Sequence, residues 1–231
     1  MNFLITGASR GIGYDTALAL AAHEAHTVLA ISRNAERLEK LATTAHQRYG
    51  RNAIRVLPYD LTQPEPARLL DWVHASGPLH GLLNNAGLLI NKPFRELTSA
   101  DWQASFATNF FGVVELVRTL LPVLDRAHIL NIGSMGGFQG SAKFPGLSAY
   151  SASKGALANL TECLAEELRE EGIVVNCLAL GAVQTEMLAT AFPGLQAPVA
   201  SEQMGRFVAY FLQEGRHFFN GKVLPVSVST P

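Results

Sequence analysis

Residues 2–13 read NFLITGASRGIG, and this stretch decides the fold. A short apolar run ending at Thr6 passes through three glycines into the Ala- and Leu-rich run 12–23. Glycine lets the backbone turn tightly beside a phosphate, and the N-terminus of the following helix attracts the anion. The Gly-x-x-x-Gly-x-Gly spacing therefore predicts a nucleotide site, with a plain glycine turn as the alternative. Its predicted binding residues are Gly7, Ser9, Arg10, Gly11, Ile12 and Gly13.

Short apolar runs alternate with longer amphipathic runs along the rest of the chain. Strands are predicted at 3–6, 27–32, 53–58, 81–84, 128–132, 173–178 and 222–228. Helices are predicted at 12–23, 34–49, 63–76, 99–124, 148–171 and 201–212. Strands joined through helices of this length run parallel, with right-handed crossovers. The pattern predicts an α/β doubly wound Rossmann fold: a mainly parallel seven-stranded sheet with helices on both faces and ligands at the carboxyl ends of the strands.

The size and charge of the chain bound its organisation. A length of 231 residues favours one nucleotide-binding domain over 1–231, with substrate loops at 135–149 and 182–200. Only 16% of residues are charged, against about 25% in typical proteins, which indicates extra buried surface and hence a homo-oligomer. The net charge of −1 favours neither nucleic acid nor an anionic membrane as a partner.

Cysteines and the N-terminus bear on the compartment. Cys163 and Cys177 are too few for a disulfide framework or a metal cluster, so we interpret both as free thiols of a reduced compartment. The seven histidines are scattered and suggest no metal site. No basic region or cleavage site precedes the first strand, and no apolar run reaches the ~18 residues of a membrane span. These features predict a cytoplasmic protein without a metal.

The end of the second predicted strand bears on the choice of cofactor. In NAD-binding domains, an acid about 20 residues beyond the glycine loop binds the ribose 2′-hydroxyl. Here that position is Arg33, preceded by Ser32, and a guanidinium binds a phosphate bidentately. Arg33, helped by Arg10, therefore predicts NADP(H) over NAD(H). The alternative is that Arg33 is a solvated loop arginine.

Two further strand ends carry candidate cofactor contacts. Asp60 and Leu61 follow the third strand, where an adenine ring would lie and Asp60 would accept from its amine. Helix capping or a turn is the alternative role of Asp60. After the fourth strand come Asn85, Ala86 and Gly87, small residues where the backbone must pass a ligand, with an ordinary turn as the alternative.

Tyr150 and Lys154 are four positions apart in a predicted helix, so they share one face. An ammonium beside a phenol favours the phenolate and lowers a pKa that is ordinarily near ~10. Such a phenol exchanges protons near neutral pH. By itself the spacing is also that of an ordinary exposed helical face. Two other polar residues stand out: Asn109, an amide among apolar helical neighbours, and Ser134, a hydroxyl at a strand end. Their alternatives are a structural amide and a turn residue.

Together these residues resemble the short-chain dehydrogenase/reductases, in the shorter single-domain branch. The matching motifs, in the family's order, are Thr6-Gly7…Gly11-Ile12-Gly13, Asn84-Asn85-Ala86-Gly87, Asn109, Ser134 and Tyr150…Lys154. The resemblance implies that Tyr150 is the general acid or base, and that Lys154 lowers its pKa and holds the nicotinamide ribose. It implies that Ser134 binds the substrate oxygen, and that Asn109 supports a water that links Lys154 to a proton relay.

Two segments depart from the family pattern. The usual Pro-Gly after the sixth strand is Leu180-Gly181 here, and we expect Gly181, Val183 and Thr185 still to meet the cofactor. Ser134 and Tyr150 are 16 residues apart, more than usual, which puts the position of Ser134 in question. The extra residues are expected to line the substrate mouth with Phe138, Phe144 and Leu147, or else to form a surface loop. The apolar residues of 186–200, namely Met187, Leu188, Phe192 and Leu195, favour an apolar carbonyl compound.

The resemblance implies an NADP(H)-dependent carbonyl reductase or alcohol dehydrogenase, assembled as a homodimer or homotetramer through the helices near 100–124 and 149–171. One alternative is a catalytically silent NADP(H)-binding regulator on the same fold, which would be expected to lack the tyrosine, lysine or serine. Another is an epimerase or dehydratase with tightly bound NAD. Its relatives usually carry a larger C-terminal domain, and Arg33 argues against NAD.

Overall fold

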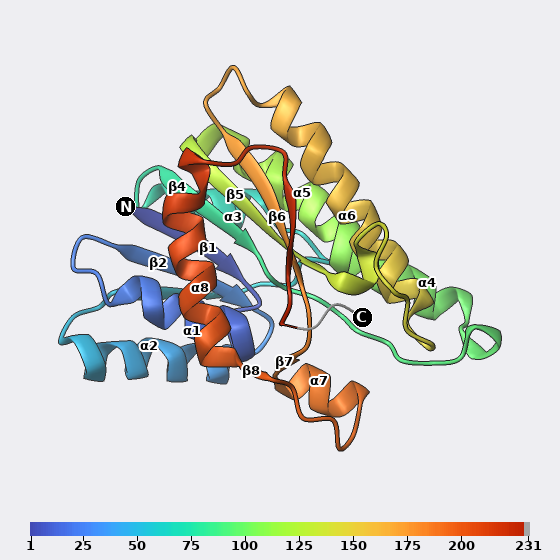
Figure 1. The fold of residues 1–231 in the computed structure, drawn as a ribbon. Coiled ribbons are helices and arrows are strands. Elements are labelled where there is room, and N and C mark those ends of the chain that lie inside the picture. The colour runs from blue at the N-terminus through green and yellow to red at the C-terminus, as the bar shows by residue number, and fades with distance from the viewer. Residues whose placement is uncertain (229–231) are drawn as a thin grey trace.

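The computed structural model of the chain describes residues 1–228, so residues 229–231 of the predicted domain lie outside it. Within the described part, seven parallel strands form one sheet in the order β3-β2-β1-β4-β5-β6-β9 (Figure 1). The strands are β1 (Asn2–Thr6), β2 (Thr27–Ser32), β3 (Ile54–Pro58), β4 (Leu79–Asn84), β5 (Leu124–Ser134), β6 (Val174–Leu180) and β9 (Val223–Val226). The predicted doubly wound fold is confirmed.

Helices cover both faces of the sheet (Figure 1). One face carries α1 (Gly11–Ala21), α2 (Ala35–Tyr49) and α8 (Ser201–Glu214). The other carries α3 (Pro66–His74), α4 (Ser99–Phe106), α5 (Gly112–Leu120) and α6 (Ser148–Glu167). Short 3₁₀ turns lie at Phe94–Glu96, Leu121–Val123, Met135–Gly137 and Gly215–His217. Each face buries its own apolar core, which is why the strands are apolar throughout rather than alternating.

The strand order reverses between β1 and β4, which are neighbours in the sheet. From β1 the chain builds outward to β3 on one side, then returns to β4 and builds outward on the other. At such a reversal the connections leave in opposite directions, so a crevice opens beyond the carboxyl ends of the strands. The loops after β1 and β4 both begin at this edge, and the candidate site residues gather there.

The long helix predicted at 99–124 is interrupted. A π-helical stretch at Ala107–Phe111 separates α4 from α5, and Pro122 closes the run in a 3₁₀ turn because proline lacks the donor that would continue it. β5 therefore begins at Leu124, earlier than predicted. The run Ser99–Val123 is long and apolar enough to cross a membrane by length and composition alone, a property shared by core helices of soluble proteins. In this fold it packs on the sheet through residues such as Leu116 and Leu120.

The predicted substrate loop 182–200 contains regular structure. Two short parallel strands, β7 (Val183–Gln184) and β8 (Val199–Ala200), enclose the helix α7 (Glu186–Ala191). Thr185 caps α7 by accepting a hydrogen bond from the backbone N–H of Leu188 at 3.2 Å. Threonine is a favoured N-cap, so the local sequence explains the helix. In Figure 1, α7 lies below the sheet, beyond the carboxyl ends of the strands.

Candidate active site

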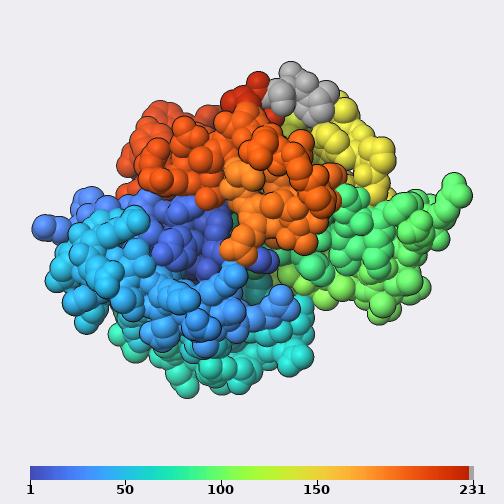
Figure 2. Space-filling view, turned by 90° about the horizontal axis from the view of Figure 1, so that it is seen from below, coloured from blue at the N-terminus to red at the C-terminus, as the bar shows by residue number. Residues whose placement is uncertain are grey.

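A cavity of about 650 Å³ lies beyond the carboxyl ends of the strands, between the two halves of the sheet. Figure 2 shows the segment after β6, in orange, beside the hollow between the blue N-terminal part and the green part of the chain. This volume is typical of a ligand site. Of the residues predicted from the sequence, those lining it are Gly7, Ser9, Arg10, Gly11, Ile12, Arg33, Asp60, Leu61, Asn85, Ala86, Gly87, Ser134, Tyr150, Lys154, Gly181, Val183 and Thr185.

Gly13 lies outside this lining and has a packing role. A Cβ at Gly13 would lie 2.4 Å from the Nδ2 of Asn85 and 2.7 Å from the carbonyl oxygen of Gly7. The Asn85 amide donates to the carbonyl oxygens of Thr6 and Gly7, at 3.0 and 3.2 Å. The third glycine thus lets Asn85 fix the shape of the loop. Its contribution to cofactor binding is indirect.

The start of α1 fits an anionic group. Arg10 at its N-cap makes no side-chain capping hydrogen bond, and the first turn holds no acid. The N–H groups of that turn are therefore left for another acceptor, and their partial positive charge favours an anion. Gly11 has a φ of 56°, and a Cβ there would contact only Thr185, at 3.4 Å or more. The loop thus leaves room for a pyrophosphate against the helix end.

Tyr150 lies buried at the floor of the cavity, with 9% of its surface exposed. Burial raises the pKa of its phenol to about 12, and a hydrogen bond with Ser134 partly opposes that rise. The pKa lowering by Lys154 expected from the sequence is wrong for this arrangement, because burial dominates. A phenol of raised pKa holds its proton at neutral pH, which suits a proton donor.

Lys154 is 3% exposed, and its Nζ donates to the carbonyl oxygen of Ile132 at 2.7 Å. Its Nζ is 6.0 Å from the centre of the Tyr150 ring. Burial lowers the pKa of Lys154 to about 8, since the charged form loses its water. The i, i+4 spacing therefore brings both side chains to the cavity, while the ammonium is held by the backbone of β5.

Asn109 is fully buried in the π-helical stretch. Its Oδ1 accepts from the N–H of Leu88 at 2.7 Å, and its Nδ2 donates to the carbonyl of Leu88 and to the Oγ of Ser153, both at 2.9 Å. The amide thus joins the loop after β4 to the residue before Lys154. This geometry makes Asn109 a positioning residue that does not line the cavity. π-bulges occur frequently at functional sites.

The segment between Ser134 and Tyr150 keeps the serine in place. The 3₁₀ turn after β5 packs so closely on α6 that a Cβ at Gly137 would lie 2.7 Å from the backbone N of Gly155. Ser134 therefore stays near Tyr150, where it lowers the pKa of the phenol, despite the added residues. Phe144 and Leu147 line the cavity as expected, whereas Phe138 lies outside its lining and that expectation is wrong.

At the adenine end, Asp60 lines the cavity but also forms a turn. Its Oδ1 accepts from both the N–H and the hydroxyl of Thr62, at 2.9 and 2.8 Å. The second carboxylate oxygen is not used by these two bonds. The turn predicted as an alternative role is therefore present, beside a possible adenine contact.

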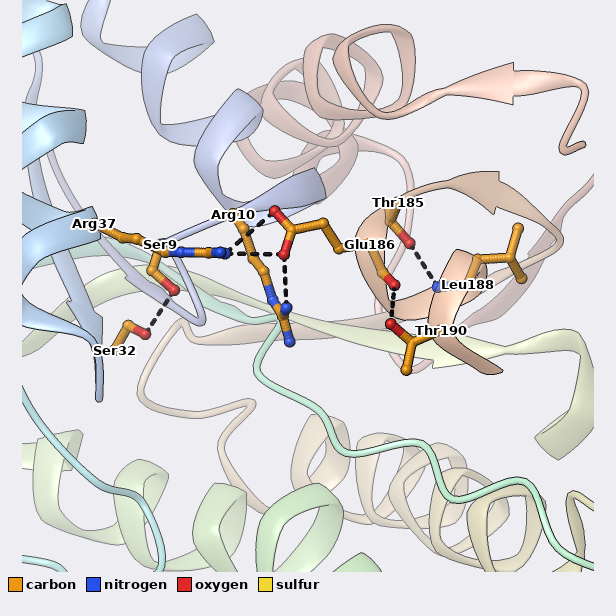
Figure 3. A network of polar contacts seen from close by, with 8 residues as sticks. All are labelled: Ser9, Arg10, Ser32, Arg37, Thr185, Glu186, Leu188 and Thr190. Carbon is orange, nitrogen blue, oxygen red and sulfur yellow. Dashed lines mark hydrogen bonds and ion pairs between the residues drawn. The ribbon is translucent and has the colours of Figure 1, made fainter. Parts of the chain in front are cut away.

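A basic hollow adjoins the cavity next to β2. Its lining residues are Ser9, Arg10, Ser32, Arg33, Asn34 and Arg37. The hydroxyls of Ser9 and Ser32 are hydrogen-bonded at 2.9 Å (Figure 3). Arg33 is exposed. Three guanidinium groups and two hydroxyls suit a phosphate. Arg37 was missed from the sequence, although it stands one turn into α2 beyond Arg33.

Glu186 was also missed. Its carboxylate accepts from Arg10 at 2.8 Å and from Arg37 at 2.9 and 3.2 Å (Figure 3). Hydrogen bonds from Arg10 and then Arg37 lower the pKa of Glu186 below its ordinary value. Glu186 is 149 or more positions from both arginines, and no local sequence pattern indicates a contact over that separation. Only the fold reveals it.

Comparisons with known proteins point to one family. A family model described as "short chain dehydrogenase" matches residues 2–196. Gluconate 5-dehydrogenase of Gluconobacter oxydans is 36% identical over 80% of this chain and 72% of its own length. A dehydrogenase/reductase from Sinorhizobium meliloti has 31% identity and a TM-score of 0.84, covering 97% of this chain and 92% of that one. A short-chain dehydrogenase from Shigella flexneri, solved in complex with NADP, has 28% identity and a TM-score of 0.86, covering 97% and 95%.

Proposed function

The chain belongs to the short-chain dehydrogenase/reductase family, and on that premise we propose that it is an NADP(H)-dependent carbonyl reductase. The observation that carries the proposal is that the buried phenol of Tyr150, the buried ammonium of Lys154 and the hydroxyl of Ser134 line one cavity. A carbonyl oxygen bound between the two hydroxyls would meet a polarising donor and a proton source together.

The basic hollow supports NADP(H) over NAD(H). Arg10, Arg33 and Arg37 surround it. No acid is among its lining residues in the described part of the chain, although the Glu186 carboxylate reaches Arg10 and Arg37 from α7. A 2′-phosphate carries about two negative charges and three acceptor oxygens, which forked guanidinium groups bind well. The Shigella flexneri neighbour was solved with NADP, which agrees with this preference.

In the proposed reaction, bound NADPH supplies the hydride. Ser134 donates a hydrogen bond to the carbonyl oxygen, and Tyr150 transfers its proton to that oxygen as negative charge develops there. Lys154 holds a positive charge nearby, because its pKa of about 8 leaves it protonated at neutral pH. With its raised pKa, Tyr150 keeps its proton at neutral pH, and the developing alkoxide is a strong enough base to take that proton.

The substrate end of the cavity supports an apolar carbonyl substrate. Its lining residues are Leu89, Met135, Phe144, Leu147, Met187, Leu188, Phe192 and Leu195. Arg33 and Asp60, two of the charged lining residues, follow β2 and β3 at the nucleotide end. An uncharged aliphatic or aromatic ketone or aldehyde loses little hydration in such a pocket, whereas a carboxylate or polyol would lose hydrogen bonds to water.

The test is Tyr150→Phe, assayed at the NADPH absorbance with a panel of apolar and charged carbonyl compounds. We expect wild-type turnover on the apolar members, a loss of at least about 100-fold in the variant, and NADPH binding that changes little. A wild-type protein that binds NADPH but turns over no member of the panel supports a silent regulator instead. Turnover confined to charged substrates contradicts the proposed substrate class.

We also propose assembly through the face carrying α4, α5 and α6, in the cytoplasm as the sequence predicts. Phe94 and Phe111 on this side are 73% and 60% exposed, and Phe111 contacts Phe106 and Phe110. Burying such aromatic surface favours association. Phe111→Ser is expected to lower the molar mass measured by light scattering, and an unchanged mass excludes this face.

A further inference from the structure

We infer that in the free protein Glu186 binds two of the arginines that would hold a 2′-phosphate, and that it must release them when NADP(H) binds, so that cofactor binding acts directly on α7. This inference rests on the proposed cofactor. It concerns a carboxylate that reaches the nucleotide end from the helix that borders the substrate end (Figure 3).

The partners of Glu186 are two arginines of the basic hollow. Arg10 and Arg37 both line the basic hollow, and both guanidinium groups are bonded to the same carboxylate. Each uses its NH1 atom, and the Oε2 of Glu186 serves both. A carboxylate and a phosphate present the same kind of oxygen to a guanidinium. Glu186 therefore makes the contacts that a 2′-phosphate would make with these two arginines.

The ion pairs of Glu186 are exposed to water. The side chains of Arg10, Arg37 and Glu186 are 49%, 42% and 54% exposed. Ion pairs this accessible to water are weak, because solvent and salt screen them. A phosphate dianion carries more charge and more acceptors than one carboxylate. The exchange of Glu186 for the phosphate is therefore favourable, and the two anions repel each other if both remain.

The release of Glu186 affects the substrate end of the cavity through α7. Glu186 is the first residue of α7, and the next two residues, Met187 and Leu188, line the cavity. The helix is otherwise held at its ends: Thr185 caps it, and the Nδ2 of Asn91 donates to the carbonyl of Ala191 at 2.8 Å. When Glu186 is released, α7 loses its only ion pairs within the described residues. NADP(H) binding thus loosens the wall of the substrate pocket, whereas NAD(H), without the phosphate, does not.

The test measures binding without catalysis. We use 2′,5′-ADP, which carries the 2′-phosphate, and 5′-AMP, which lacks it, with calorimetry on the wild type and on Glu186→Gln. The variant is expected to bind 2′,5′-ADP about three- to tenfold more tightly at low salt, with the gain shrinking as salt rises, and to bind 5′-AMP as the wild type does. Arg37→Ala is expected to weaken 2′,5′-ADP binding alone. Glu166→Gln and Arg169→Ala remove an exposed ion pair on α6 and serve as matched controls.

Hydrogen exchange of the α7 amides supplies the second readout. In the wild type, 2′,5′-ADP is expected to speed exchange in 187–192, while 5′-AMP leaves it unchanged. In Glu186→Gln, exchange is fast already and 2′,5′-ADP adds nothing. Equal affinity of wild type and Glu186→Gln for 2′,5′-ADP overturns the inference while leaving the proposed cofactor intact. A wild type that binds 5′-AMP as tightly as 2′,5′-ADP overturns the proposed cofactor itself.

Discussion

The Nζ of Lys154 donates to the carbonyl oxygen of Ile132 across 2.7 Å, so the backbone of β5 holds the ammonium in the floor of the cavity. The lysine is 3% exposed, and burial lowers its pKa from 10.5 to about 8. A buried ammonium held by one backbone carbonyl destabilises the fold, and a purely structural residue would not retain it.

Replacing this lysine should therefore stabilise the protein while removing activity. At any pH below 8, folding must desolvate the ammonium, so Lys154→Met is expected to raise the free energy of unfolding by about 1–3 kcal/mol. As the pH rises from 8 towards 10.5, the folded protein loses its proton first and the gain shrinks. Urea unfolding at pH 7 and pH 10 measures both effects. The exposed Lys143→Met is the control, and a variant less stable than wild type at pH 7 contradicts the argument.

Removing the Asn109 amide should destabilise both segments that it joins. Asn109→Ala leaves the N–H and carbonyl of Leu88 and the hydroxyl of Ser153 without this partner, an expected loss of about 2–4 kcal/mol. Turnover should fall more than NADPH binding, since Ser153 adjoins Lys154. Asn159→Ala, an exposed site on α6, is the control in thermal unfolding. Equal stability of the two variants argues against the role of Asn109 in joining these two segments.

Two helical glycines should respond in opposite directions to alanine. At Gly13 the new methyl group meets Asn85 and the carbonyl of Gly7 at less than 3 Å, so Gly13→Ala is expected to cost about 1–3 kcal/mol and to weaken nucleotide binding. At Gly155 the nearest atom is a carbonyl oxygen at 3.5 Å, so Gly155→Ala should stabilise α6 by about 0.5–1 kcal/mol. Denaturant midpoints and calorimetric NADPH affinities measure both, and a neutral Gly13→Ala disproves the packing role.

His128 should make stability fall in mild acid. Its Nδ1 contacts the carbonyl of Leu212 at 3.0 Å, and its Nε2 accepts from the amide of Asn176 at 3.1 Å, an arrangement for neutral imidazole. Burial foremost lowers its pKa to about 4, with Arg216 and His217 adding to the shift. Between pH 6.5 and 4 the unfolded chain therefore binds a proton that the folded chain does not.

The loss from His128 is at most about 3 kcal/mol, complete near pH 4, and absent above pH 6.5. His128→Gln should be less stable than wild type at pH 7 but lose less on acidification, as measured by urea unfolding from pH 7 to 4.5. The exposed His46→Gln is the control. His26, whose pKa burial also lowers to about 4, adds a parallel slope that persists in His128→Gln. Parallel curves for His128→Gln and wild type refute the assignment.

The local sequence predicts the strands, the glycine loop and the N-cap at Asn34. The Asn34 side chain accepts from the N–H of Arg37 at 2.8 Å. These features depend on neighbours in the chain, so a single sequence reveals them. The π-helical stretch around Asn109 was not predictable, because it depends on partners at Leu88 and Ser153 supplied by other elements. The pKa of Tyr150 was predicted in the wrong direction, since a spacing of four residues specifies a shared face but not the burial that dominates the shift. The contact of Glu186 with Arg10 and Arg37 depends wholly on the fold.

The packing of α1 against α8 also governs the order in which a nascent chain can fold. Gly205 on α8 lies so close to α1 that a Cβ there would be 2.5 Å from the Cβ of Asp15. Buried residues of α1, such as Leu18, share one core with Met204 and Val208. During synthesis, the apolar side of α1 therefore stays exposed to water until α8 has left the ribosome. Long-range pairing of this kind slows folding and leaves apolar surface open to aggregation or to chaperones until the last turn of α8 arrives.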